Sequence, residues 1–299
     1  MVPRIGSKRF QEVTPADLSL LYSALEKPEA RRNKKEGCGL SNLTIWHVHT
    51  FLEALYSFAE HNGDLDRSPA RKTRPNVPRC ADKMPPAVDV AETERLLQTV
   101  REVEPTLFPP VMVSTYLGTR RGETCGVRWS DIDFAKSEVT IRRSVTRTKL
   151  EGLLIKSTKT KKERTLPLDP ATLTEFESLR RSQRRDRMTW GPGWEGGESP
   201  DDDYVCTSLN GSVLNPDAFS SRYRTFAHRN GFAAITPHVL RHAFVSQLIA
   251  LGFDAVTIAS MSGHSPDVLL NVYAHAFDER KRDAMEALAE ARRLVRVTA

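Results

Sequence analysis

The sequence predicts a mainly helical protein with one small antiparallel β-sheet, divided into a helical N-terminal module and a larger α+β domain. Three observations lead to this prediction. Apolar residues recur mostly at helical spacing, a proline-rich stretch interrupts the pattern at residues 67–88, and short β-type segments gather between residues 138 and 168. The 299 residues are enough for two domains.

Composition and charge argue against a secreted, membrane-spanning or disulfide-rich protein. The net charge is +6, and 27% of the residues are charged. The first fifteen residues contain no apolar segment, and the longest mostly apolar stretch, residues 244–253, is too short to span a bilayer. We therefore expect a cytoplasmic protein with no signal peptide and no membrane partner. The cysteines are far apart and form no CxxC pair, which predicts reduced thiols; they are Cys38, Cys80, Cys125 and Cys206.

The N-terminal module is predicted to contain two helices. In "TPADLSLLYSAL", Thr14 is a suitable N-cap, Pro15 fits the first helical position, and the leucines follow at helical spacing. The second helix, "LSNLTIWHVHTFLEALYSFAEHNG", ends at Gly63, a common C-terminal residue. Residues 67–88 contain five prolines and several basic side chains, which predicts a basic linker.

The larger domain is predicted to begin with two helices, "DVAETERLLQTVREV" and "PPVMVSTYLG", the second ending at Gly118. "SDIDFAKS" is predicted to form turns, and "EVTIRRSVTR", "GLLIKST" and "ERTLPL" are predicted to form three strands of one sheet. A helix, "ATLTEFESLRRSQRRDRM", precedes an expected mobile loop, "TWGPGWEGGESPDDD"; a short strand, "YVCTS", and the helix "DAFSSRYRTFAHRNG" follow. The last predicted helices are residues 237–251, 255–261, 266–277 and 281–297.

Four stretches contain candidate functional residues. In "TPHVLRHAF", His238 and Arg241 share a face of the first helical turn, where free N–H groups already attract anions. In "SGHSPDVLLNVYAH", His264 lies in a turn nine residues before Tyr273. Arg120 lies in the tight turn of "LGTRRGE", which can direct a guanidinium into a cleft. Each pattern alone also fits an ordinary surface or core position.

A basic hairpin is the fourth candidate. "IKSTKTKKERTLPL" places four lysines around a predicted tip, and residues 142–164 include nine basic and two acidic side chains. Such a hairpin suits a duplex groove, and a solubilising turn is the alternative. The lysines are Lys156, Lys159, Lys161 and Lys162.

The order and spacing of these stretches resemble the tyrosine recombinases of the phage-integrase type. That family has an arginine box similar to "LGTRRGE", a hairpin lysine as in "TKTKKERTLPL", a second box as in "HVLRH", and a third as in "GHSPDVLLNVYAH". The resemblance implies a helical core-type DNA-binding domain with its linker at residues 1–82 and a catalytic domain at residues 83–299.

The resemblance also implies a role for each matched residue. Tyr273 is the expected nucleophile, and Arg120 and Arg241 are expected to clamp the scissile phosphate. Lys159 is expected to protonate the leaving 5′-oxygen. His238 and His264 are expected to complete proton transfer and hydrogen bonding around the phosphate, with Glu123 supporting the first arginine. Apart from the resemblance, His242 lies four residues after His238, and we expect it to have a structural role.

The implied chemistry is consistent with these side chains. Two guanidiniums suit the charge that develops on the nonbridging oxygens, and a tyrosine needs nearby cations or a base to react at neutral pH. A covalent 3′-phosphotyrosine retains the energy of the broken strand, so rejoining needs no ATP. The sequence contains neither a GxxxxGK[ST] motif nor an acidic cluster with metal spacing. We therefore expect no cofactor and no metal.

The expected partners are double-stranded DNA at specific core-type sites, three further copies in a homotetramer on paired sites, and accessory DNA-bending proteins. Residues 281–297 are expected to pack either on their own domain or on a neighbouring copy. The helical module begins almost at the first residue, so we expect either a two-domain enzyme or one that has lost an arm-binding domain. Thr119 and Ser262 depart from the family pattern, which usually has apolar residues at these two positions.

Three functions remain open at this point. The first is an active site-specific recombinase or integrase. The second is a type IB topoisomerase, which uses a similar set of residues but acts as a monomer. The third is a decayed integrase that binds DNA without cleaving it. The compact two-domain layout and the complete set from Arg120 to Tyr273 favour the first.

Overall fold

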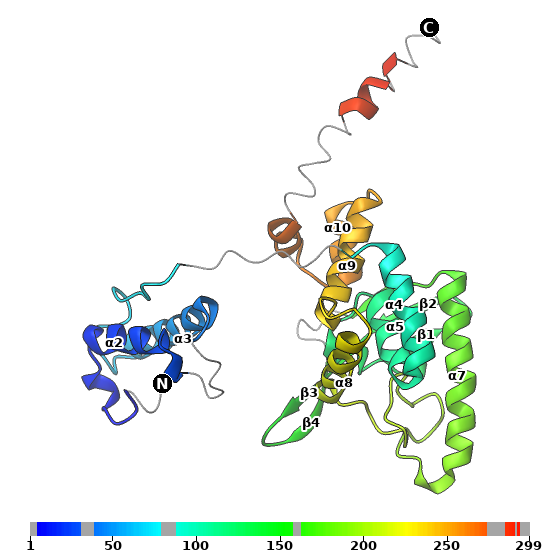
Figure 1. The fold of residues 1–299 in the computed structure, drawn as a ribbon, viewed down its shortest axis with the longest axis horizontal. Helices are drawn as coiled ribbons and strands as arrows, with labels where there is room; N and C mark the ends of the chain where they lie inside the picture. Colours follow the sequence, from blue (N-terminus) through cyan, green and yellow to red (C-terminus); the bar gives the residue numbers. More distant parts are fainter. Residues whose placement is uncertain are drawn as a thin grey trace. The chain divides into compact units, whose positions relative to one another are not determined.

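The structure is a computed structural model that describes residues 5–30, 39–78, 88–157, 163–273, 285–290 and 292–293. Its contacts divide the chain into two compact units, Met1–Lys83 and Met84–Ala299, whose elements are labelled in Figure 1. Among the described residues, no helix combines the length and the apolar character needed to cross a membrane.

The first unit is built on two helices, α2 (Pro15–Leu25) and α3 (Asn42–His61), with short 3-10 turns η1 (Phe10–Glu12) and η2 (Pro28–Ala30). A capping box between Thr14 and Asp17 begins α2, as the sequence predicts. Apolar faces of the two helices form a small core, in which the Tyr22 hydroxyl lies 3.1 Å from His49 Nδ1. The core residues of the two helices include Leu18, Leu21, Ile45, Leu52 and Tyr56.

The second unit is mainly helical. Its helices are α4 (Val90–Val103), α5 (Phe108–Tyr116), α6 (Arg121–Thr124), α7 (Pro170–Trp190), α8 (Pro216–Arg229), α9 (Pro237–Ala250) and α10 (Ala255–Ser262); residues 266–273 are also helical. Short 3-10 turns are η3 (Pro105–Leu107), η4 (Trp129–Asp131) and η5 (Gly191–Gly193). Side-chain caps begin α4, α7, α8, α9 and α10, where they satisfy N-terminal N–H groups that lack helical partners. These caps are Asp89, Asp169, Asn215, Thr236 and Asp254.

The β-structure differs from the predicted single sheet. Strands β1 (Ile132–Asp133), β2 (Glu138–Ile141) and β5 (Arg164–Pro167) form one antiparallel sheet in the order β1-β2-β5, and β3 (Arg143–Thr148) pairs with β4 (Gly152–Ser157) in a separate hairpin. The predicted strand "EVTIRRSVTR" is interrupted at Arg142, because Ile141 pairs with Arg164 whereas Arg143 pairs with Ser157. The chain therefore changes partner at Arg142.

Two smaller predictions were also wrong. "SDIDFAKS", predicted as turns, contains β1, where Ile132 faces Val139 of β2. "YVCTS", predicted as a strand, has only isolated bridges at Tyr204 and Thr207. Both segments are short, so tertiary pairing rather than local pattern decides their state.

The segment predicted to be a mobile loop, residues 189–203, is held by a buried carboxylate. Asp203 is 2% exposed and accepts hydrogen bonds from Arg187 at 2.8 Å, from the indole of Trp194 at 3.1 Å and from the Gly197 backbone at 2.7 Å. Burial of a carboxylate is tolerated here because several donors satisfy it. The Gly/Pro composition alone does not reveal this internal anchor.

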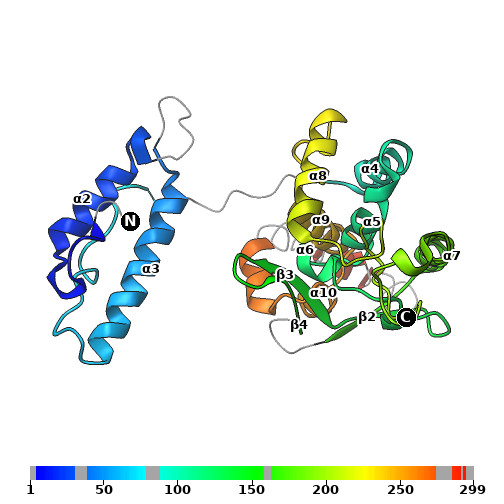
Figure 2. The same cartoon turned by 90° about the horizontal axis from the view of Figure 1, so that it is seen from below.

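Helix α9 lies between two apolar clusters. Leu240 and Ala243 belong to the large core that includes α4, α5, α8 and both β-sheets, whereas Val245 and Ile249 pack with Ile258 of α10 and its neighbours. The views in Figures 1 and 2 show α9 among α5, α8 and α10. The mainly helical fold with small antiparallel sheets confirms the predicted fold class.

Truncation of the core at Leu96, which is fully buried in α4, is expected to lower the free energy of unfolding by about 2–5 kcal/mol, because the lost contacts leave a cavity. Urea unfolding of Leu96→Ala measures this change. Val103→Ala on the same helix is the control, since Val103 is 58% exposed and should change stability by less than about 0.5 kcal/mol. Equal losses in both variants would contradict the assignment of Leu96 to the core.

Candidate active site

The first turns of α9 place three functional side chains together. The Thr236 hydroxyl accepts a hydrogen bond from the Val239 N–H at 3.2 Å, and Pro237 is the first helical residue. His238, Arg241 and His242 follow within little more than one turn. His238 is exposed, whereas Arg241 is only 2% exposed. The helix therefore directs one arginine inward and one histidine toward the surface.

Arg120 reaches the same region from the start of α6. Its guanidinium donates to Glu123 Oε1 at 2.9 Å and to the carbonyl of Gly263 at 2.7 Å, and its backbone N–H donates to Glu123 Oε2 at 3.0 Å. The side chain of Arg120 stays half exposed. The neighbouring Arg121 instead contacts α8, with Ser220 at 3.1 Å. The two arginines of "LGTRRGE" thus differ in their partners, although both line the cavity described below.

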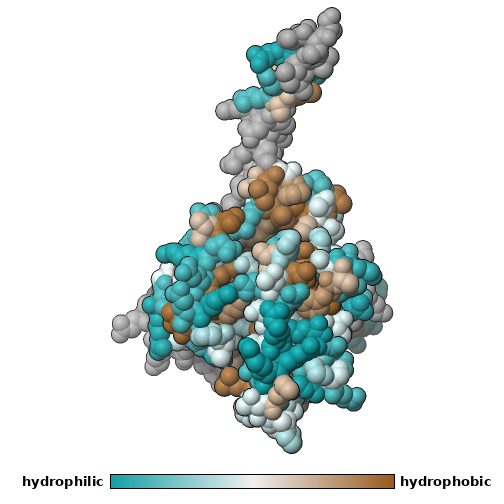
Figure 3. Space-filling view, turned by 90° about the vertical axis from the view of Figure 1, so that its right-hand side faces the viewer, coloured by the Kyte–Doolittle hydropathy of each residue, from teal (hydrophilic) through white to brown (hydrophobic). Residues whose placement is uncertain are grey.

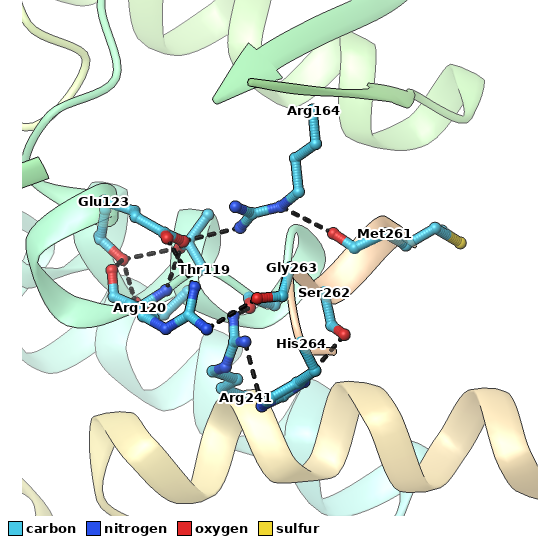
Figure 4. Close-up of polar contacts among 12 residues, drawn as sticks. Thr119, Arg120, Glu123, Arg164, Arg241, Met261, Ser262, Gly263 and His264 are labelled. Carbon is cyan, nitrogen blue, oxygen red and sulfur yellow. Dashed lines mark hydrogen bonds and ion pairs between the residues drawn. The ribbon is translucent and has the colours of Figure 1, made fainter. Parts of the chain in front are cut away.

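Glu123 joins two arginines from distant parts of the chain. Besides Arg120, it accepts from the Arg164 guanidinium at 2.7 Å, and Arg164 also donates to the Met261 carbonyl at 2.8 Å (Figure 4). Burial alone would raise the pKa of Glu123, but the hydrogen bond and charge of Arg164, together with Arg120, hold this pKa below its usual value. The ionised carboxylate thus connects α6, β5 and the end of α10.

Arg241 is fixed on its buried side by the backbone. It donates to the Gly118 carbonyl at 2.7 Å and to His264 Nε2 at 3.1 Å. A side chain at position 118 would collide with the Phe244 ring, because an added Cβ would lie 2.4 Å from it, and the glycine has a φ of +55°. Burial, and then the charge of Arg120, lower the pKa of Arg241 to about 9, so the guanidinium remains charged at neutral pH.

His264 is held in one neutral tautomer. A guanidinium only donates, so His264 Nε2 must accept from Arg241, and the ring proton lies on Nδ1. Nδ1 then donates to the Ser262 hydroxyl at 2.9 Å, which donates to the Ile258 carbonyl at 2.7 Å. Burial, followed by the charge of Arg241, lowers the pKa of His264 to about 3. Ser262, a departure from the family pattern, thus orients this histidine.

The other departure, Thr119, is also satisfied internally. It is 1% exposed, and its hydroxyl lies 2.7 Å from the Thr124 hydroxyl and 3.3 Å from the Val113 carbonyl. A buried hydroxyl with such partners replaces an apolar residue without leaving an unpaired polar group.

Tyr273 is buried at the side of α9, only 4% exposed. Its Oη lies 2.5 Å from His242 Nδ1, and His242 Nε2 lies 3.0 Å from His238 Nε2. Burial raises the pKa of Tyr273 to about 12 despite the nearby charge of Arg241. The sequence analysis predicted only a structural role for His242, but this side chain also contacts the hydroxyl of the expected nucleophile.

A cavity of about 550 Å³ opens beside these groups. Its lining includes Arg120, His238, Arg241 and His264. Figure 4 shows the guanidiniums of Arg120, Arg164 and Arg241 converging around Glu123 and the turn at Gly263. Three guanidiniums around one carboxylate leave an excess of positive charge, which suits a bound anion such as phosphate.

Five of the six predicted site residues lie near one another around α9: Arg120, His238, Arg241, His264 and Tyr273. The sixth, Lys159, lies outside the described residues, so its role stays a prediction. Two residues that the sequence analysis did not assign to the site also contact this group, Arg164 and His242. The sequence signal for Arg164 was its position directly before the predicted strand "TLPL". The signal for His242 was its position four residues after His238, which places both side chains on one helix face.

The sequence of the chain is similar to a family model and to several known proteins. Residues 87–280 match the model of the phage integrase family. The chain is 23% identical over 268 residues to a tyrosine recombinase XerC-like protein of Caldanaerobacter subterraneus, covering 86% of this chain and 68% of that protein. It is 22% identical to tyrosine recombinase XerA of Pyrococcus furiosus, covering 81% of this chain and 74% of that protein.

Solved structures are similar in fold. The Tn1549 transposon integrase, solved in complex with a circular intermediate DNA, matches with a TM-score of 0.75 and 20% identity, covering 95% of this chain and 88% of that chain. A lambda integrase dimer bound to a core site matches with a TM-score of 0.58 and 14% identity, covering 89% and 81%. At these identities the likeness concerns the fold alone.

Removal of the Glu123 charge is expected to destabilise the second unit, because it leaves the buried Arg164 without its counter-ion. We expect Glu123→Gln to lower the free energy of unfolding by about 3 kcal/mol at pH 7. The folded-state pKa of Glu123 lies below its usual 4.5, so this contribution is present above pH 4.5 and is lost as the pH falls through the folded-state value.

Urea unfolding of both proteins between pH 7 and pH 3 measures this difference, which should shrink below pH 4.5. Glu151→Gln is the control, since Glu151 is exposed in the turn between β3 and β4. A difference that stays constant down to pH 3 would show that the Glu123 carboxylate is not the stabilising group.

Proposed function

Since the chain belongs to the phage integrase family, we propose that it is a site-specific DNA recombinase that cleaves and rejoins strands through a covalent 3′-phosphotyrosine at Tyr273. The observation that supports this most strongly is the convergence of Arg120 and Arg241 on one cavity, beside the helix whose His242 contacts the Tyr273 hydroxyl. Cations and a tyrosine from segments far apart in sequence meet only because the fold brings them together.

Each side chain has a chemical task in this proposal. Attack on the phosphodiester concentrates negative charge on the nonbridging oxygens, and the guanidiniums of Arg120 and Arg241 stabilise it with charge-assisted hydrogen bonds. His264, oriented by Ser262, accepts at Nε2 from Arg241 and so holds this guanidinium toward the phosphate. Lys159 protonates the leaving 5′-oxygen, which is otherwise a poor leaving group. The phosphotyrosine retains the bond energy, so strand joining needs neither ATP nor a metal.

The partner in this proposal is double-stranded DNA at specific core-type sites, which implies a cytoplasmic enzyme. The helical domain of residues 1–82 and the catalytic domain of residues 83–299 both contact the duplex. The phosphate contacts should make binding fall steeply with salt. We also propose that accessory DNA-bending proteins act together with the enzyme on its DNA sites. The family match favours this function over a type IB topoisomerase, and the decayed-integrase alternative is tested by strand cleavage.

We further propose a homotetramer on paired sites, in which residues 281–297 of one copy pack on the next copy. Support comes from apolar side chains exposed at the end of α9 and the start of α10, with Leu251 at 73%, Phe253 at 50% and Val256 at 67%. Figure 3 shows apolar surface gathered in the part of the second unit where α9 and α10 lie in Figure 1. Met285 and Leu288, three residues apart in the C-terminal helical segment, are exposed as well.

Replacement of the nucleophile is the direct test of cleavage. A nicked duplex with the protein's own binding site, selected from a random-sequence pool, should yield a covalent adduct that survives denaturing electrophoresis. Tyr273→Phe should bind this DNA with unchanged affinity and reduce the adduct to background, because the variant lacks only the attacking oxygen. Tyr116→Phe is the matched control and should give the wild-type amount of adduct. An adduct formed by Tyr273→Phe would identify a different nucleophile.

An acidic residue in the apolar patch should prevent assembly without preventing binding. Phe253→Asp is expected to bind a single site but to reduce the tetramer on paired sites at least about tenfold, because burying an unpaired charge opposes docking. Mass photometry of the DNA complexes measures the distribution. Leu209→Asp, at a position that is 71% exposed in another part of the unit, is the control. A tetramer of normal abundance with Phe253→Asp would exclude this patch as the contact.

A further inference from the structure

The contacts of Tyr273 lead from a buried hydroxyl to the protein surface. Its Oη is 2.5 Å from His242 Nδ1, His242 Nε2 is 3.0 Å from His238 Nε2, and the two imidazole rings lie edge to face with centroids 4.4 Å apart. Tyr273 is 4% exposed, His242 is half-buried and His238 is exposed. A proton that leaves the buried phenol can therefore follow this line of histidines.

We propose that His242 is a further catalytic residue, which takes the proton of the Tyr273 hydroxyl and passes a proton to His238. This proposal rests on the proposed function, in which Tyr273 attacks DNA. It assigns to His242 a role in activating the nucleophile, distinct from the roles of the arginines and of Lys159.

The hydrogen-bond directions are consistent with this relay. The Tyr273 hydroxyl lies 2.5 Å from His242 Nδ1, and a neutral imidazole nitrogen can accept the phenol's proton in this contact. A histidine that accepts at Nδ1 carries its proton on Nε2, where it faces His238 Nε2. His238 then accepts at Nε2 and carries its own proton on Nδ1.

Atoms and charge balance in one concerted step. The O–H bond of Tyr273 breaks as the Nδ1–H bond of His242 forms, and the Nε2–H bond of His242 breaks as an Nε2–H bond of His238 forms. Tyr273 becomes a phenolate hydrogen-bonded to the His242 N–H, His242 ends neutral, and His238 ends as an imidazolium. A DNA phosphate in the cavity that His238 lines would stabilise that positive charge.

The charges around His242 favour a relay over simple protonation. Burial, then His238 and Arg241, lower the pKa of His242 to about 4, so an imidazolium at this position is unfavourable. A histidine that releases one proton while it accepts another never needs to hold this charge. Its neutral ring also keeps the Nδ1 lone pair available for the phenol at neutral pH.

The test uses His242→Asn in the 299-residue chain, since asparagine can still accept a hydrogen bond near the Nδ1 position but cannot pass a proton onward. Single-turnover cleavage of the nicked site should slow about 100-fold, within the range typical of acid–base catalysis, with DNA affinity unchanged. His228→Asn, an exposed histidine near the end of α8, is the control and should cleave at the wild-type rate.

Two chemical modifications, one in the DNA substrate and one at Tyr273, distinguish proton transfer by His242 from mere positioning of Tyr273. With a 5′-bridging phosphorothiolate, whose sulfur leaves without an acid, His242→Asn should stay slow, whereas Lys159→Ala should recover. With a trifluorinated tyrosine at position 273, which ionises near neutral pH, the loss caused by His242→Asn should fall to within about threefold, because a base contributes less to an ionised phenol.

The relay is overturned if His242→Asn cleaves the normal substrate as fast as wild type, or if it loses the same factor with the fluorinated tyrosine. The wild-type adduct in the same gel reports the role of Tyr273 separately, so failure of the relay leaves the proposed nucleophile standing. If the double variant with both His238→Asn and His242→Asn cleaves no more slowly than His242→Asn alone, the two histidines act on one shared proton path.

Discussion

The buried carboxylate of Glu123 is the interaction on which the site depends. It pairs with Arg120 from its own helix and with Arg164 from β5, and Arg164 in turn holds the end of α10 through the Met261 carbonyl. Without this negative charge, three guanidiniums would face one another in a partly desolvated space. The carboxylate offsets part of that repulsion and leaves a positive excess, which a phosphate can neutralise. Stability and anion binding therefore share one network.

Hydrogen bonds to backbone carbonyls set the positions of the arginines. Arg241 is tied to Gly118 and Arg120 to Gly263, and both glycines have positive φ angles, +55° and +69°. A side chain at Gly263 would approach Arg164 to 2.8 Å. These turns thus bring carbonyl oxygens close to guanidiniums, and the geometry exists before any ligand arrives. Preorganised donors of this kind need little rearrangement when charge develops on a substrate.

Burial opposes reactivity at the tyrosine, and the surrounding groups compensate for it. The apolar cluster that fixes Tyr273 also raises the pKa of its hydroxyl. The charge of Arg241 acts in the opposite direction, and the neutral His242 offers an acceptor at 2.5 Å. Burial, and after it the nearby positive charges, lower the pKa values of His238, His242 and His264, so these imidazoles are neutral before any substrate reacts. They remain available as hydrogen-bond acceptors.

Most of the longer helices, the Thr14 cap and the boxes around Arg120, Arg241 and Tyr273 are predictable from the sequence, because caps, periodicity and motif spacing are local properties. It also indicated the two-part organisation through the proline-rich linker. Contacts between distant segments depend on the folded arrangement of the whole unit and have no local signal. The division of one predicted strand at Arg142, the anchoring of residues 189–203 by Asp203, and the pairing of Glu123 with Arg164 all depend on partners far along the chain. The contact of His242 with Tyr273 likewise depends on the packing of residues 266–273 against α9, which no local pattern encodes.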